Sequence, residues 1–206
     1  MNTPTRAIKM TTGVKRIHAM VRGKKANQSG FTLIELIVVS AIVMILGIAG
    51  LIGIRGYIVN GRIEPGSHEL RRAMQRMSIN AEGQGATPFA SASTAQFCNL
   101  LRDGSVIAVT GTGATATCAH SLTYSGTKAI TVAPATTTTL GDAYSITLTS
   151  TSEYACPDLL SIMQKASLTM SVNGTSVLSL GGTYNAAAAT AACTSGDTNT
   201  FVFTAS

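Results

Sequence analysis

The segment GFTLIELIVVSAIVMILGIAGLIGI, residues 30–54, decides how this chain is organised. After the initial glycine it contains 24 residues and a single charged side chain, Glu35. A helix of this length rises about 1.5 Å per residue and is about 36 Å long, which is enough to cross the hydrocarbon core of a bilayer. The segment therefore predicts a membrane-spanning helix near the N-terminus.

Glu35 is the unusual residue of this helix. A carboxylate at membrane depth costs on the order of 2.5–3.5 kcal/mol, so Glu35 needs a partner. A secretory signal peptide is a poorer explanation, because its apolar core has about 7–15 residues and precedes its cleavage site. Here the apolar run is longer and its glycine, Gly30, comes first. A plain signal-anchor helix with an incidental glutamate is the simplest alternative.

The basic charge of the chain is concentrated before this helix. Residues 1–29 hold seven of the 15 Lys and Arg residues and none of the nine Asp and Glu residues. By the positive-inside rule this asymmetry places residues 1–29 in the cytoplasm and the rest of the chain on the opposite side. The remaining eight basic and nine acidic residues nearly cancel, so the charge does not predict a nucleic-acid-binding surface.

The residues Gly30-Phe31-Thr32-Leu33-Ile34-Glu35, followed by an uncharged helix, closely resemble the processing site of type IV pilins. The resemblance implies that prepilin peptidase removes residues 1–30, that the new N-terminal Phe31 is N-methylated, and that Glu35 guides assembly. It also implies an α+β fold, in which a long N-terminal helix carries a head with an antiparallel sheet. The long leader is typical of the type IVb branch, whereas Phe31 as the first mature residue is not.

Cleavage after Gly30 would create a positive charge that can pair with Glu35. Before cleavage the nitrogen of Phe31 is an uncharged amide, and afterwards it is an amine that is cationic when protonated. A buried charge without a partner is strongly unfavourable, and pairing offsets much of its cost. We therefore expect Glu35 of one subunit to pair with the Phe31 amine of a neighbour in a filament.

Three segments follow from this comparison: a leader over residues 1–30, an N-terminal helix over 31–80 and a head over 81–206. Residues 31–54 would span the membrane before assembly and form the filament core afterwards. This helix contains glycines at three-residue spacing, namely Gly47, Gly50, Gly53 and Gly56. Glycine weakens a helix by roughly 0.5–1 kcal/mol relative to alanine. The spacing fits either close helix packing in a membrane or a segment that stretches by losing helical hydrogen bonds.

Glu64-Pro65-Gly66 is expected to break or kink the helix, since proline lacks an N–H donor and clashes with the preceding turn. The next segment has apolar residues at helical spacing: Leu70, Ala73, Met74 and Met77. This pattern predicts an amphipathic helix over about 67–80 that packs on an apolar surface. Its other face is expected to be solvated and holds Arg71, Arg72, Gln75 and Arg76.

The head combines short helices and strands. Helices are expected over about 94–102, 156–165 and 186–192, and strands over 143–149 and 200–204. LTMSVNGTSVLSL predicts a β-hairpin, in which Asn173-Gly174 supplies the two positive-φ residues of a type I′ turn. A helix followed mainly by strands is typical of an α+β domain.

Four cysteines follow the membrane segment, on the side where disulfides persist: Cys98, Cys118, Cys156 and Cys193. Four cysteines allow three pairings, and the sequence does not choose among them. The C-terminal part resembles type IVb pilins, in which one cysteine opens a helix and a second lies shortly before a final strand. The resemblance implies a Cys156–Cys193 disulfide, and Cys98–Cys118 is expected as an addition to the family's usual bond.

No catalytic, metal-binding or cofactor-binding site is expected. Ser125-Gly126-Thr127-Lys128 fits SxxK, but strand-like sequence follows it, whereas that chemistry needs the serine and lysine one helical turn apart. The GxGxxA pattern at 111–116 does not open a helix, as a dinucleotide-binding turn must. His120 lies near Cys118 without a second pair of ligands, and the sequon at Asn173 is better explained by the hairpin turn.

The resemblance implies a structural protein and not an enzyme, namely a subunit that polymerises into an extracellular type IV pilus. Its expected partners are other copies of the chain, the prepilin peptidase and methyltransferase, the inner-membrane assembly platform and the membrane before assembly. A minor pilin and a type II secretion pseudopilin are alternatives within this class, and the C-terminal cysteines favour a pilin. A membrane-tethered binding or enzyme domain is the alternative outside it and would need a convergent polar site.

Overall fold

The structure is a computed structural model that describes residues 31–206, with the backbone alone for residues 51–53. The expected leader, including the cleavage residue Gly30, lies outside the described residues. By its internal contacts the chain divides into two units, one ending at Val43 and one running from Met44 to Ser206. The helices are α1 (Leu33–Ala81), α2 (Thr94–Asn99), α3 (Cys156–Met163) and α4 (Ala186–Ala192), with 3-10 turns at Gly113–Thr115 and Glu153–Ala155.

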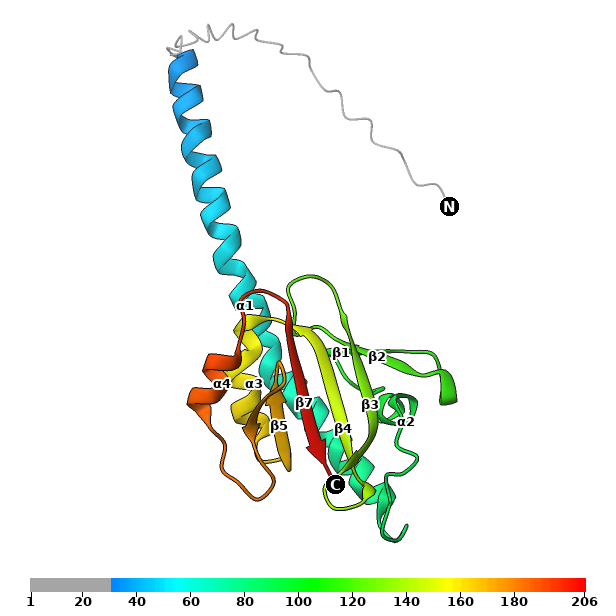
Figure 1. Cartoon of the computed structure of the whole chain (residues 1–206). Coiled ribbons are helices and arrows are strands. Elements are labelled where there is room, and N and C mark those ends of the chain that lie inside the picture. Colours follow the sequence, from blue (N-terminus) through cyan, green and yellow to red (C-terminus); the bar gives the residue numbers. More distant parts are fainter. Residues whose placement is uncertain (1–30) are drawn as a thin grey trace, which may run out of the picture. The chain divides into compact units, whose positions relative to one another are not determined.

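The second unit is organised around a seven-stranded antiparallel sheet in the order β1-β2-β3-β4-β7-β5-β6. The strands are β1 (Ile107–Thr110), β2 (Thr117–His120), β3 (Lys128–Thr136), β4 (Leu140–Thr151), β5 (Thr169–Val172), β6 (Thr175–Leu178) and β7 (Asn199–Ala205). The last strand of the chain, β7, lies near the middle of the sheet between β4 and β5 (Figure 1). The expected α+β class is confirmed.

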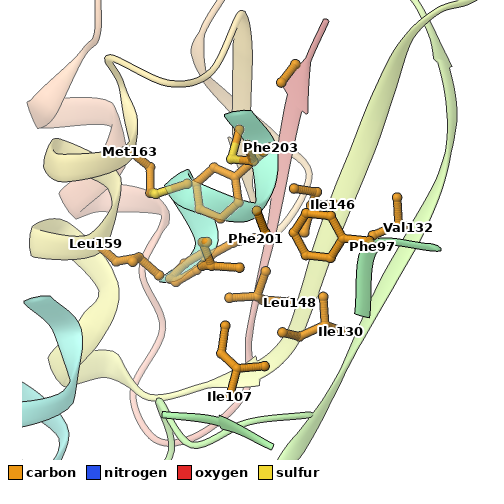
Figure 2. Close-up of a cluster of buried hydrophobic side chains, with 14 of the residues drawn as sticks. Phe97, Ile107, Ile130, Val132, Ile146, Leu148, Leu159, Met163, Phe201 and Phe203 are labelled. Atoms are coloured by element: carbon orange, nitrogen blue, oxygen red, sulfur yellow. The ribbon is translucent and has the colours of Figure 1, made fainter. Parts of the chain in front are cut away.

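Side-chain alternation gives the sheet one apolar face. Paired residues form two buried rows across its centre, Val132-Ile146-Phe203-Met170 and Ile130-Leu148-Phe201-Val172. Figure 2 shows this face meeting Leu159 and Met163 of α3 and Phe97 of α2. The opposite side chains of the same strands are small and half-buried or exposed, so one face of the sheet forms the core and the other faces solvent.

The C-terminal part of α1 covers the apolar face of the sheet, as its periodicity predicts. Leu70, Ala73, Met74 and Met77 are each at most 3% exposed and belong to the same buried cluster as the two rows. The hydroxyl of Tyr144 in β4 donates a hydrogen bond to the Met74 carbonyl at 3.1 Å. Burial of the ring raises the pKa of Tyr144 to about 12, so the phenol remains a donor over the physiological range.

Of the break or kink expected at Pro65, the break does not occur, because α1 continues through this residue. An interior proline costs about 3 kcal/mol. On either side of it, Ile63 is 4% exposed and Leu70 is fully buried, and burying each such side chain stabilises by about 1.5–3 kcal/mol. The hydroxyl of Ser67 also donates to the Glu64 carbonyl at 2.7 Å. Packing on both sides of the proline therefore outweighs its local cost.

The short elements of the head match their local signals closely. Asn173 and Gly174 have φ values of 49° and 82°, which confirms the predicted turn between β5 and β6. Helix α4 begins and ends at the expected residues, and the Asn185 side chain caps it by accepting from the Ala188 N–H at 3.0 Å. Helix α2 is shorter than expected and ends at Asn99.

A buried carboxylate fastens α1 to the start of β1. Glu69 is 7% exposed and accepts hydrogen bonds from the backbone N–H groups of Ser105, Val106 and Ile107 and from the Ser105 hydroxyl. Burial alone would raise the pKa of Glu69, but these donors outweigh it and hold the pKa below its ordinary value. The charged form of Glu69 is thus the form that the fold stabilises.

Two disulfides close the head, Cys98–Cys118 and Cys156–Cys193, the pairs expected from the sequence comparison. The first joins α2 to β2, and the second joins the start of α3 to the residue that follows α4. Their Cα–Cα distances, 5.4 Å and 6.1 Å, lie in the usual range for disulfides. Each bond therefore holds a peripheral helix to the rest of the head.

Replacing Glu69 by glutamine is expected to destabilise the head at neutral pH by about 1–3 kcal/mol, because the amide accepts fewer of the backbone N–H bonds and its own N–H₂ faces donors. The folded-state pKa of Glu69 is depressed, so its stabilisation is present above the unfolded-state pKa and is lost as pH falls through the folded-state pKa. Urea unfolding of the wild type and of Glu69→Gln at several pH values should therefore show a difference in the free energy of unfolding that becomes smaller in acid. Glu82→Gln, at an exposed position, serves as the control and should unfold with the same free energy as the wild type at each pH.

Removing each disulfide by a double Cys→Ser change should cost about 4 kcal/mol for Cys156–Cys193 and about 3 kcal/mol for Cys98–Cys118 in the chain-entropy treatment. The difference follows from the longer loop of the first bond, which spans 37 residues against 20. Thermal unfolding under non-reducing conditions measures both. Peptide mapping without reduction checks the pairing, and a peptide that links Cys98 to Cys156 would contradict it.

Candidate assembly site

The first turn of α1 holds the residues expected to control assembly. The Thr32 carbonyl accepts the first helical hydrogen bond, from the Leu36 N–H at 3.1 Å. The Thr32 side-chain hydroxyl accepts a second bond, from the Glu35 N–H at 3.3 Å. Thr32 is therefore the N-cap of α1, and Glu35 stands three residues later, the positions of a capping box. Sequence reasoning assigned no role to Thr32, although the pattern T-x-x-E before an apolar run signals it.

Phe31 and Glu35 are both exposed at this helix end, and Phe31 is 80% exposed. Among residues 31–206, the Glu35 carboxylate has no recorded hydrogen-bond or salt-bridge partner. A carboxylate in the first turn is favoured by the positive end of the helix dipole. The arrangement leaves the charge of Glu35 open to a group from outside the described chain.

The side chains that follow form an uncovered apolar surface. The large apolar residues from Leu33 to Ile48 are each at least 50% exposed: Leu33, Ile34, Leu36, Ile37, Val38, Val39, Ile42, Val43, Met44, Ile45, Leu46 and Ile48. Soluble monomers rarely expose a continuous apolar patch of this extent. By length and composition α1 also meets the requirements of a membrane-crossing helix. This surface needs either lipid or other apolar helices around it.

The glycines of α1 meet different surroundings. Apart from the neighbouring backbone of the helix itself, no atom of the described residues lies within 4 Å of a Cβ added at Gly47 or Gly50, so packing among these residues does not require glycine there. A Cβ at Gly56, in contrast, would lie 3.1 Å from the ring of Tyr154. Gly56 therefore lets Tyr154 pack directly on the helix backbone. The helix is continuous through all of these positions.

Beside this contact, a second carboxylate organises the loop between β2 and β3. Asp197 accepts hydrogen bonds from the Thr123 hydroxyl at 2.7 Å and from the backbone N–H groups of Tyr124 and Ser125 at 3.0 and 3.1 Å. Burial by itself raises the pKa of Asp197, but these donors lower it by more, so the pKa lies below its ordinary value. The ring of Tyr124, held by this loop, lies 4.4 Å from the guanidinium carbon of Arg55 in α1.

His120 is a buried structural residue. Its Nδ1 accepts from the Leu122 N–H at 3.3 Å, and its Nε2 lies 3.0 Å from the Thr149 carbonyl, so a neutral ring with its proton on Nε2 satisfies both. Burial lowers the pKa of His120 to about 4. Within residues 31–206, no three His, Cys, Asp or Glu side chains gather as a metal site would require.

The other sequence motifs take up structural positions. Lys128 opens strand β3 and Ser125 lies in the preceding bend, so the SxxK residues do not share a helical turn. The side-chain amide of Asn173 donates to the Ala192 carbonyl at 2.8 Å and to Asn199 Oδ1 at 2.9 Å. The asparagine of the sequon is thus engaged in holding the β5–β6 turn to α4 and β7.

Two family models match this chain. One, described as the prokaryotic N-terminal methylation motif, matches residues 25–51, which include Gly30, Phe31 and Glu35. The other, described as PilS N terminal, matches residues 108–206, from β1 to the end of the sheet. No curated protein matches the chain in sequence. The crystal structure of a type IV b pilin from Salmonella typhi is 22% identical, with a TM-score of 0.49, over 70% of this chain and 97% of its own. The two family matches, one over the N-terminal helix and one over the head, support a likeness of this chain to type IV pilins.

Proposed function

We propose that the chain is a structural subunit of an extracellular type IV pilus, cleaved after Gly30, N-methylated at Phe31 and polymerised through the apolar part of α1. The observation that carries this proposal is the uncovered apolar surface from Leu33 to Ile48. Burying such a surface against copies of itself, as the helices leave the lipid, supplies most of the attraction for a filament core. The methylation-motif match over the same residues supports the same role.

In this proposal the chain has three functional segments. Residues 1–30 are a cytoplasmic leader removed by prepilin peptidase, residues 31–80 are the assembly helix, and residues 81–206 are the periplasmic and later extracellular head. The precursor sits in the inner membrane and meets the methyltransferase and the assembly platform there. The two disulfides suit a head that folds on the oxidising side of the membrane.

The specificity of assembly comes from a pair of charges. Glu35 has no partner among residues 31–206, and cleavage gives Phe31 an amine that is cationic when protonated. In an apolar filament core the carboxylate of one subunit pairs with the amine of its neighbour, and each charge lowers the cost of burying the other. An uncleaved subunit lacks the amine, so the pair selects processed subunits.

Glu35→Ala is expected to leave cleavage and membrane insertion intact while reducing filament yield. Removing the carboxylate relieves a membrane cost of about 2.5–3.5 kcal/mol, so the membrane pool should not fall. In the filament the neighbour's amine is then buried without a partner, at a cost of about 3–5 kcal/mol. Subunit in the membrane fraction and in sheared filaments should be measured separately, in cells that express only the variant.

The exposed Glu82→Ala removes one carboxylate just beyond α1 and should assemble as the wild type does. Normal filament yield from Glu35→Ala would contradict the assembly role and return the helix to a simple membrane anchor. Intact-mass and N-terminal analysis of sheared filaments tests the processing step, with methylated Phe31 as the expected first residue. The share of filament mass contributed by this chain separates a major subunit from a minor one.

A further inference from the structure

A hollow of about 480 Å³ lies beside the first buried turn of α1. Its walls come from Arg55 in α1, from the β2–β3 loop at Tyr124 and Ser125, from the 3-10 turn after β4 and from the α4–β7 loop. Figure 1 shows the β2–β3 loop and the α4–β7 loop at the same end of the sheet. We call this hollow the helix-entry pocket, and its volume is typical of small-ligand sites.

The helix-entry pocket stands where α1 would leave the membrane. The apolar run has 24 residues from Phe31 to Ile54, and Arg55 is the next residue. A helix of this length is about 36 Å long, whereas the hydrocarbon core of a bilayer is about 30 Å thick. In the membrane form of the subunit, Arg55 therefore lies at the level of the lipid headgroups on the side of the head.

The exposed aromatic rings support this placement. Among residues 31–206 they are Phe31, Tyr57, which is 83% exposed, and Tyr124, which is 43% exposed. Tyrosine is enriched at membrane–water interfaces because its ring is apolar and its hydroxyl is polar. One exposed ring precedes the apolar run, and the two tyrosines belong to the region just beyond its other end, as the two aromatic belts of a membrane protein do.

Two charged side chains of the pocket are available to a ligand, Arg55 and Glu153. The guanidinium carbon of Arg55 lies 4.4 Å from the centre of the Tyr124 ring, and a guanidinium over a ring keeps its N–H donors for another acceptor. Glu153 is held in place by its backbone N–H, which donates to the Gly196 carbonyl at 2.9 Å. Within residues 31–206, the structure records no salt bridge and no side-chain hydrogen bond for Arg55 or Glu153.

The other carboxylate of the pocket, Asp197, is already engaged. It accepts hydrogen bonds from the Thr123 hydroxyl and from the backbone N–H groups of Tyr124 and Ser125. These bonds fix the loop that carries the Tyr124 ring. The pocket therefore offers a guanidinium to an anion and the Glu153 carboxylate to a cation, and tyrosine rings form part of its wall.

We propose that the helix-entry pocket binds the zwitterionic headgroup of a phosphoethanolamine lipid while the subunit is in the membrane. The phosphate accepts hydrogen bonds from Arg55, and the ammonium group donates to Glu153 and lies against the tyrosine rings. A purely anionic headgroup fits less well, because it offers no cation to Glu153 and brings a second negative charge near it. The inference rests on the membrane stage of the proposed function.

The test offers the full chain, purified in detergent, either phosphatidylethanolamine or phosphatidylglycerol with the same acyl chains, and counts bound lipid by native mass spectrometry. Both lipids have the phosphate, but only the first has an ammonium group. Arg55→Gln should lower retention of phosphatidylethanolamine about tenfold, because the phosphate loses its charged donor. Glu153→Gln should lower it by a similar factor without lowering retention of phosphatidylglycerol. Comparing each variant with the wild type cancels any binding of phosphatidylglycerol to the basic leader.

Matched variants separate charge in the pocket from charge elsewhere. Arg55→Lys and Glu153→Asp keep the charges and should retain more phosphatidylethanolamine than the glutamine variants do. Arg72→Gln and Glu82→Gln remove the same charges at exposed positions outside the pocket and should bind both lipids as the wild type does. Thermal unfolding checks that the head of every variant is intact. Retention that is unchanged in Arg55→Gln and Glu153→Gln overturns the inference, and so does an equal loss of both lipids in Glu153→Gln.

A competition on the wild type tests the same inference without any substitution. Soluble phosphoethanolamine should displace phosphatidylethanolamine from the chain more strongly than glycerol phosphate does, and equal displacement overturns the inference. Membrane fractionation keeps this result apart from the proposed function. A chain that stays in the bilayer without a headgroup preference overturns only the inference, whereas a chain that does not enter the membrane overturns the proposed function and the inference with it.

Discussion

Burial of one face of α1 against the apolar face of the sheet is the contact on which the head depends. Met74 and Met77 of the helix belong to the same cluster as Phe201 and Phe203 of β7, which lies between β4 and β5 in the sheet. A single sheet with one apolar face cannot be stable in water until that face is covered. The helix provides the cover, and packing stabilises it in return, since α1 continues through Pro65.

The N-terminal part of the same helix carries side chains that nothing in the described chain covers. From Leu33 to Ile48 the apolar residues point outward on all sides, so this part cannot be explained as the core of a soluble domain. One element thus meets two environments, a protein core in its C-terminal part and an external apolar medium in its N-terminal part. The proposed function, in which the subunit moves from a bilayer to a filament core, needs both.

The carboxylates divide the charge of the head into two roles. Glu69 and Asp197 accept several backbone N–H bonds each, and Asp142 does the same for the turn at 137–139, which lowers the pKa of all three groups. These acids hold loops and are not available for contacts with other molecules. The acids that remain exposed on the head include Glu64 and Asp158.

The sequence by itself determined the local elements, because each depends on neighbours in the chain. The apolar run after Gly30, the 3.6-residue periodicity at Leu70–Met77, the turn at Asn173-Gly174 and the helix at 186–192 all carry their signals within a few residues. The capping pattern at Thr32 is equally local, and the sequence alone would have predicted it. Only the tertiary structure decided what depends on distant partners: the place of β7 between β4 and β5, and the anchoring of Ser105–Ile107 by Glu69. Pro65 shows the physical reason. Its local cost of about 3 kcal/mol is smaller than the stabilisation from burying the side chains around it, and only the assembled core supplies that burial.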